Sequence, residues 1–191
     1  MVSSTYLVLI RCLVAVALLG QPCSSSAQSP STGAIPEIPW VVKCADGHCL
    51  MEIDVPFERG HGVEHSRLAV ALDQKTKSAE YVAIYLPPDV DSSAGASIGF
   101  WDIVLRDKKW TATPSSKVYS LPIMECTTEA CVSRVHQMLD NDDGTYLDLL
   151  AELQKHGHLW VAFTRRGETT PVSISIPIYK FRDEFLRISN D

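Results

Sequence analysis

The stretch Trp40-Val-Val-Lys-Cys44-Ala-Asp-Gly-His-Cys49-Leu-Met-Glu-Ile-Asp-Val55 decides the fold class of this chain. Two strand-like runs are joined by residues 45–48, and the Asp-Gly pair at their centre is preferred in tight hairpin turns. One cysteine stands on each side of that turn. The sequence therefore predicts a β-hairpin whose tip is closed by its own cysteines.

Strand patterns continue along most of the chain. Residues 172–178 show the clearest one, because their isoleucines alternate with serines as in a half-buried strand. Residues 56–66 are rich in Gly, His and Pro, so we expect a loop there. Further strands are expected at 67–73, 79–86, 97–106, 110–113, 118–122, 131–138 and 159–165.

Two short helices interrupt the strands. Thr145 can cap the first helix, and Gly157 is expected to end it in a left-handed conformation. The second helix is expected near the C-terminus, where Phe181, Phe185 and Ile188 follow helical spacing. The whole pattern predicts a mainly β fold, a single antiparallel β-sandwich or barrel-like domain with one mid-chain helix and a short C-terminal helix.

The N-terminal segment has the features of an export signal. An apolar region interrupted by Arg11 precedes Ser25-Ser26-Ala27, which resembles a signal-peptidase site. We expect residues 1–27 to be a cleaved signal peptide, 28–39 a flexible Ser/Pro-rich lead-in, and 40–191 the domain. An uncleaved membrane anchor is the competing interpretation, although the apolar region is shorter than a span of roughly 20 residues requires. The protein is thus predicted to be periplasmic or associated with the outer surface, without a stable membrane span after cleavage.

Export changes how the cysteines are interpreted. Loss of the leader leaves four of the six cysteines, which fits two disulfides in an oxidising compartment. Of the three possible pairings we favour the local one, Cys44 with Cys49 and Cys126 with Cys131. Each such loop stabilises by only about 2 kcal/mol in the chain-entropy model. A metal site that uses Cys44, His48 and Cys49 is the alternative.

The charge excludes some classes of partner. The formal net charge is −6, and no block of Lys and Arg with interleaved aromatics is present. Neither nucleic acid nor an anionic membrane is therefore expected as a partner. No cofactor is predicted.

The order of short motifs resembles that of a known family. A W-x-V-x-C start at Trp40 leads to a second cysteine, a Leu-Pro strand end at Leu86, a C-x4-C-V motif at Cys126, a leucine helix and the ending 171–181. This order resembles the invasion-associated locus B proteins of Gram-negative bacteria over nearly the whole mature chain. The His/Gly segment 59–65 and Lys180, which stands where the family has Gly, depart from it.

The resemblance implies an exported all-β protein, in a family whose type member is linked to entry into host red blood cells. It implies no enzymatic activity. It does imply that the four cysteines of the mature chain form structural disulfides.

One segment contains the candidate metal-binding residues of this chain. His61, Glu64 and His65 form an H-x2-E-H pattern that could bind a metal, but Gly60 and Gly62 argue against the helix of a zinc protease. A polar loop is the plainer interpretation. A hydrolytic enzyme is a distant alternative, because no serine stands in a G-x-S-x-G context.

Three aromatic residues support a binding function. Phe100, Trp101 and Trp110 lie on neighbouring predicted strands and could share one sheet face. Core packing is the more usual role of such residues, and a partner-binding patch becomes the better explanation if Trp101 and Trp110 are exposed together. The sequence thus predicts a non-enzymatic interaction protein that binds an unknown envelope or host protein. A periplasmic metal-binding protein that uses the His/Glu segment is the first alternative.

Overall fold

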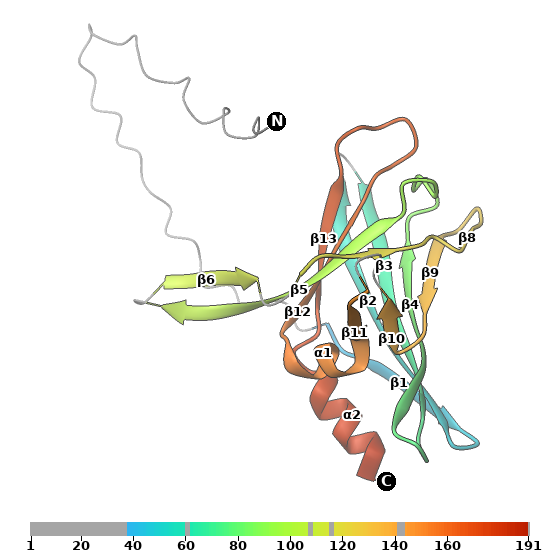
Figure 1. The fold of residues 1–191 in the computed structure, drawn as a ribbon, viewed down its shortest axis with the longest axis vertical. Helices are drawn as coiled ribbons and strands as arrows, with labels where there is room; N and C mark the ends of the chain where they lie inside the picture. The colour runs from blue at the N-terminus through green and yellow to red at the C-terminus, as the bar shows by residue number, and fades with distance from the viewer. Residues whose placement is uncertain (1–37, 60–61, 107–108, 115–116, 141–143, 191) are drawn as a thin grey trace, which may run out of the picture. The chain divides into compact units, whose positions relative to one another are not determined.

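The computed structural model describes residues 38–59, 62–106, 109–114, 117–140 and 144–190. In this part of the chain two open antiparallel sheets and a two-stranded ribbon are accompanied by two helices (Figure 1). The mainly β antiparallel fold is confirmed, whereas no closed barrel forms. The proposed leader, residues 1–27, and most of the lead-in, up to residue 37, lie outside the described residues.

The larger sheet has six strands in the order β1-β2-β3-β4-β9-β8. Its first four strands follow one another as hairpins, and β9 joins them on the far side of β4. The strands are β1 (Val41–Ala45), β2 (His48–Arg59), β3 (Gly62–Asp73), β4 (Ser78–Leu86), β8 (Glu125–Cys126) and β9 (Cys131–Val135).

The second sheet has the order β13-β12-β5-β6, and the short strand β7 also pairs with β5. Its strands are β5 (Ala96–Arg106), β6 (Lys109–Pro114), β7 (Tyr119–Leu121), β12 (His158–Phe163) and β13 (Val172–Pro177). A separate ribbon pairs β10 (Met138–Asp140) with β11 (Tyr146–Asp148).

Both sheets and both helices contribute to one hydrophobic core. Helix α1 (Leu149–Lys155) buries three leucines, and α2 (Phe181–Asn190) buries Phe181, Phe185 and Ile188 at the predicted spacing. The Phe181 ring lies 5.2 Å from that of Trp40, so the C-terminal helix packs on the residue that precedes β1. Figure 1 shows both helices at the same end of the sheets.

Both predicted disulfides are present, and each links directly paired residues of adjacent strands. Cys44 of β1 faces Cys49 of β2, and Cys126 of β8 faces Cys131 of β9. Because β1 and β8 are the two border strands of the larger sheet, each bridge ties one border to its inner neighbour.

The prediction of a loop at residues 56–66 is wrong. Strands β2 and β3 continue as a paired ladder to Arg59 and Gly62, and only residues 60–61 are not described. Strand β1 pairs with β2 only as far as Glu52. Beyond that point no strand among the described residues pairs with β2 on its outer side, so Pro56 removes no ladder donor that these strands need.

The boundaries of the mid-chain helix also differ from the prediction. Asp148, not Thr145, is the N-cap, and its carboxylate accepts a hydrogen bond from the Ala151 N–H. Gly157 does not adopt a positive φ. Its backbone N–H instead donates a 2.7 Å hydrogen bond to Asp102. The chain thus passes from the helix cap His156 directly into β12.

Among the described residues, neither helix has the length and apolar character needed to cross a bilayer.

Candidate functional site: a tryptophan-walled groove

The three predicted aromatic residues do not share one face. Phe100 is only 2% exposed and belongs to the core, whereas its neighbour Trp101 is half-buried on the outer face of the second sheet. Successive strand residues point to opposite faces, which explains the difference. Trp110 pairs with Leu105 in the β5–β6 ladder, but its side chain lies outside the described part of the chain.

Trp160, and not Phe100, shares the outer face of this sheet with Trp101. Trp160 of β12 lies opposite Gly99 of β5, two residue pairs away from the pair formed by Trp101 and His158. In β12, Leu159, Val161 and Phe163 are buried, so Trp160 lies on the outer face. The sequence does not show this alternation, because residues 159–163 are all apolar. Two tryptophans therefore lie close together on the solvent side of this sheet.

These residues line an apolar groove of about 380 Å³. It lies at the end of the β5–β6 ladder where Trp101 pairs with Pro114, away from the turn that joins the two strands. Such a volume is within the range of ligand sites. Val118, which is 62% exposed, closes one side. Apart from Phe100, the described lining residues are Gly99, Trp101, Ala112, Pro114, Val118 and Trp160.

Gly99 forms part of the groove because it lacks a side chain. A Cβ added there would lie 3.7 Å from the Trp160 ring and 3.7 Å from the Lys117 carbonyl oxygen. Both are ordinary van der Waals distances, so the space is open rather than sterically forbidden. Glycine in a strand interior weakens the strand and often marks the close approach of a ligand or another backbone. Gly99 is itself buried, and the groups that approach it are the Lys117 backbone and the Trp160 ring.

The Trp101 ring, which lines the groove, packs against the ring of His158. The two rings stack with centroids 4.3 Å apart and an interplanar angle of 23°. Burial lowers the pKa of His158 below its ordinary value, and the nearby Asp102 carboxylate opposes this only in part. The buried Nδ1 atom has no hydrogen-bond partner among the described residues. A neutral imidazole therefore packs against the indole.

A charged network lies next to this pair. His156 has a side chain only 3% exposed, with Nδ1 3.0 Å from Asp102 and Nε2 2.8 Å from Glu152. Both ring nitrogens therefore contact a carboxylate. Asp102 also accepts the Gly157 N–H. With both nitrogens engaged, His156 serves to fix the α1–β12 junction to β5.

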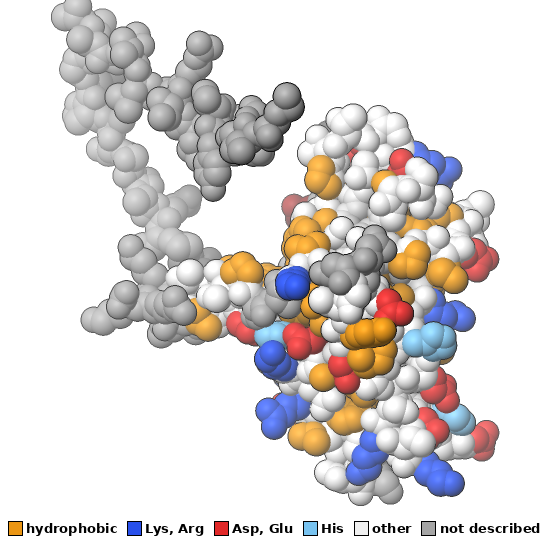
Figure 2. Space-filling view, in the orientation of Figure 1, with side chains coloured by type: hydrophobic (Ala, Val, Ile, Leu, Met, Phe, Trp, Pro, Cys, Tyr) orange, Lys and Arg blue, Asp and Glu red, His pale blue; other side chains and the backbone are white. Residues whose placement is uncertain are grey.

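The groove itself is uncharged. None of its described lining residues carries a titratable side chain. On the face shown in Figure 2, acidic and basic side chains are intermixed and form no stripe of one sign. The groove can thus take an apolar group, and its described lining residues include neither a nucleophile nor a general base.

The alternative metal residues lie elsewhere and have separate partners. Glu64 pairs with Arg165, which also binds Asp89 at 2.7 Å, while His65 lies 3.1 Å from Asp54. His61 lies outside the described residues. Within the part of the chain that the structure describes, no group of three or more His, Cys, Asp or Glu residues could hold a metal ion.

The chain matches no protein-family model, no curated protein and no solved structure. The resemblance to the invasion-associated locus B proteins therefore stays a prediction. The geometry of the groove is the main support for a functional proposal.

Proposed function

We propose that this protein is an exported, non-enzymatic interaction protein of the bacterial envelope or surface, which binds an extended, proline-bearing segment of an envelope or host protein. The observation that supports this best is the groove between Trp101 and Trp160, with Gly99 between them. The solvent side of an antiparallel sheet is ordinarily polar. Two tryptophans and a glycine at that position are better explained by recognition than by folding.

The chemistry of the groove favours a proline-bearing ligand. Aromatic-lined grooves bind polyproline II segments, whose rings pack on indoles and whose conformation is largely formed before binding. A polyproline II backbone stays solvated, so it needs few hydrogen bonds from its receptor. The described lining provides almost none from side chains, because its residues are Gly, Phe, Trp, Ala, Pro and Val. A sugar, in contrast, would leave its hydroxyl groups unpaired.

The cellular setting rests on the sequence. The leader-like residues 1–27 and the resemblance to an exported family favour a partner in the envelope or on a host cell. Two disulfides in the described domain fit an oxidising compartment. Together these features favour an extracytoplasmic partner over a cytosolic one.

The test is a titration of the mature protein with decaproline and with a Gly-Ser peptide of the same length, followed by tryptophan fluorescence and amide NMR shifts. We expect saturable binding of decaproline and none of the Gly-Ser peptide. Trp160→Ala should weaken binding at least about tenfold, as truncation of an aromatic anchor does. Tyr146→Ala, which removes an exposed aromatic ring outside the groove lining, is the matched control and should bind normally.

Gly99→Val provides a second test that leaves the tryptophans intact, because its side chain would fill the groove. It too should abolish binding. Equal responses to both peptides, or unchanged binding by both groove variants, would refute the proposal. Sedimentation checks another occupant: a dimer that Gly99→Val dissociates would show that a second copy of this chain fills the groove, and would replace the proposed ligand.

A further inference from the structure

The larger sheet has an open place beside β3 at the end where β4 stops. Strand β4 pairs with β3 only as far as Tyr85, which faces Arg67. Residues 62–65 of β3 still pair with β2 on one side, but no described strand pairs with them on the other side. In Figure 1 this is the end of the sheet that carries the β8–β9 hairpin, away from both helices.

The gap arises because the chain leaves the sheet after β4. Pro87 and Pro88 follow the last residue of that strand, and proline has no N–H group to donate to a ladder. Val90 then forms an isolated bridge with Arg165, beyond the end of β12. The chain thus crosses to the second sheet and leaves the place next to residues 62–65 open.

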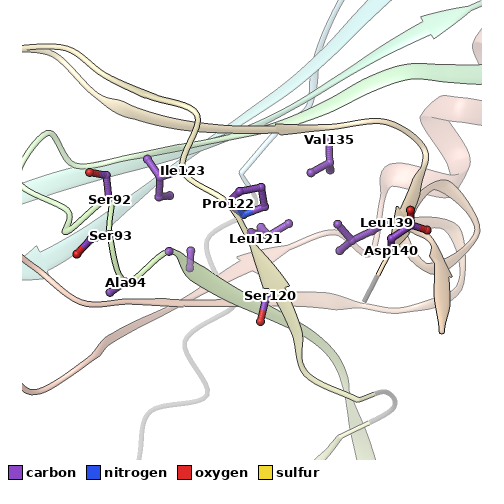
Figure 3. Close-up of a pocket in the computed structure, with 12 residues that line it drawn as sticks. Ser92, Ser93, Ala94, Ser120, Leu121, Pro122, Ile123, Val135, Leu139 and Asp140 are labelled. Carbon is purple, nitrogen blue, oxygen red and sulfur yellow. The ribbon is translucent and has the colours of Figure 1, made fainter. Parts of the chain in front are cut away.

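A cleft of about 510 Å³ occupies this place. It is lined by residues 63–65 of β3, by residues 87–89 after β4, and by Glu129 and Arg165. Successive strand residues point to opposite faces of a sheet, so one cleft reaches three consecutive residues of β3 only along the edge of the strand. The cleft is therefore an opening within the sheet. It shares no described lining residue with the tryptophan-walled groove or with the cleft drawn in Figure 3.

The lining of this gap is mainly acidic. Glu64 and Asp89 both contact the guanidinium group of Arg165, so two carboxylates share one cation. Glu129, in the turn between β8 and β9, is exposed and adds a third carboxylate. Among the described lining residues, three carboxylates thus accompany one guanidinium group. Such surroundings favour a cationic side chain over an anionic one.

The floor of the gap has an unsatisfied donor. The Arg165 side chain is 2% exposed, and its buried Nε atom has no hydrogen-bond partner among the described residues. A buried donor without an acceptor costs free energy. A main-chain carbonyl oxygen of a chain in the gap is the kind of acceptor that is missing there. Val63, which is 63% exposed, and the two prolines offer apolar surface to the same chain.

We infer that this gap binds an extended segment of another protein that carries a lysine or an arginine, and that the segment adds a strand to the edge of β3. In this mode of recognition main-chain hydrogen bonds provide affinity, and the surroundings of the side chains provide specificity. The open strand edge selects an extended main chain, and the carboxylates select the basic residue. This site does not depend on the proposed peptide groove.

Three acetylated and amidated heptapeptides test the inference. The first is Thr-Val-Thr-Lys-Thr-Val-Thr, the second has glutamate in place of lysine, and the third keeps the lysine but has N-methyl groups on its central amides. In amide NMR titrations of the mature protein, the lysine peptide should bind about fivefold more tightly than the glutamate peptide. The methylated peptide should not saturate, because it cannot donate to a ladder. The lysine peptide should also slow hydrogen exchange within residues 62–65.

A pair of charge reversals tests the role of the carboxylates. Glu129→Lys changes the exposed charge at the rim and should remove the preference for the lysine peptide. Glu125→Lys is the matched control, because Glu125 is an exposed glutamate of the same hairpin outside the lining of the gap. That variant should keep the preference. Higher ionic strength should reduce the preference in the wild type.

Equal affinity for the lysine and glutamate peptides, saturable binding of the methylated peptide, or no binding of any of the three would overturn the inference. A lysine preference that survives Glu129→Lys would do the same. Loss of lysine-peptide binding on Trp160→Ala would place that peptide in the groove instead. A dimer that Glu129→Lys dissociates would show that a second copy of this chain fills the gap, and would replace the proposed partner. Failure of decaproline to bind leaves these results unaffected, so the two proposals fail separately.

Discussion

Trp101 and His158 face each other as a registered pair on β5 and β12, with their rings stacked 4.3 Å apart. The imidazole of His158 is partly withdrawn from water, and its Nδ1 atom has no hydrogen-bond partner among the described residues. One wall of the groove therefore rests on a histidine that is held neutral. This relationship makes the domain sensitive to acid at a defined place.

The first prediction concerns the pH dependence of folding. Burial lowers the pKa of His158 in the folded state below its ordinary value of 6.5, so the unfolded chain binds this proton more tightly. The resulting penalty is absent well above pH 6.5 and grows as the pH falls through 6.5 toward the folded-state pKa. His158→Phe, which keeps a ring against Trp101, should flatten the acid decrease in the free energy of unfolding.

Urea unfolding at a series of pH values checks this expectation. His136→Phe replaces an exposed histidine of the same chain and should leave the acid decrease in place. Parallel pH profiles for the wild type and His158→Phe would show that this histidine does not contribute.

The substitution Gly99→Ala should have opposite effects on stability and on peptide binding. Its backbone does not need a positive φ, and an added Cβ would meet its nearest neighbours at ordinary contact distances. Gly99→Ala should therefore raise the free energy of unfolding by about 0.5 kcal/mol, mainly by restricting the unfolded chain. The same change should weaken decaproline binding. Denaturation and peptide titration of one preparation test both signs, and a destabilised Gly99→Ala would contradict the open space seen here.

His156 should be among the residues that contribute most to stability. Its imidazole lies between Asp102 and Glu152 and is 3% exposed, so its removal leaves two carboxylates without the ring that contacts both. His156→Leu should lower the free energy of unfolding by about 3 kcal/mol. A double-mutant cycle with Glu152→Gln should be clearly non-additive, whereas strict additivity would mean that the contact is not energetically significant.

Arg165 should be equally intolerant of change. Its guanidinium is 2% exposed and pairs with Glu64 and Asp89 at once. Lysine has a single ammonium group and cannot reproduce this two-sided arrangement. Arg165→Lys should cost about 2 kcal/mol and Arg165→Met about 3 kcal/mol in urea unfolding. Arg166→Lys, on the exposed neighbour, is the matched control and should change little.

Each disulfide should stabilise only modestly. Both bridges span a sequence separation of 5, and closing so short a loop is worth about 2 kcal/mol. The paired change of Cys44 and Cys49 to serine should lower the unfolding free energy by that amount and leave the fold intact. Thiol titration with metal analysis of the wild type checks the bridges directly. Free thiols with bound zinc would contradict them.

Local signals in the sequence were sufficient for most of the strands. The Asp-Gly turn, the two cysteine pairs and the alternation at 172–178 all act over a few residues, and each corresponds to an observed feature. The C-terminal helix followed from spacing alone in the same way.

The secondary-structure predictions were wrong where residues far away in the sequence determine the local conformation. Residues 62–65 have the composition of a loop but pair with β2 as part of β3. Gly157 has the sequence position of a left-handed cap, yet its N–H is taken by Asp102, 55 residues away.

The groove could be predicted only in part for the same reason. Trp101 was identified as a binding candidate, but its partner Trp160 lies on a strand that pairs with β5 across a long stretch of chain. Phe100 was assigned to the wrong face because the phase of β5 was not fixed by its sequence.

The placement of the two disulfides has a consequence for survival outside the cell. Open sheets are vulnerable at their margins, where backbone groups invite aggregation or let a strand peel away. In the larger sheet a disulfide links each border strand to the strand inside it. Each border strand therefore stays tethered to its inner neighbour even when the backbone pairing between them opens.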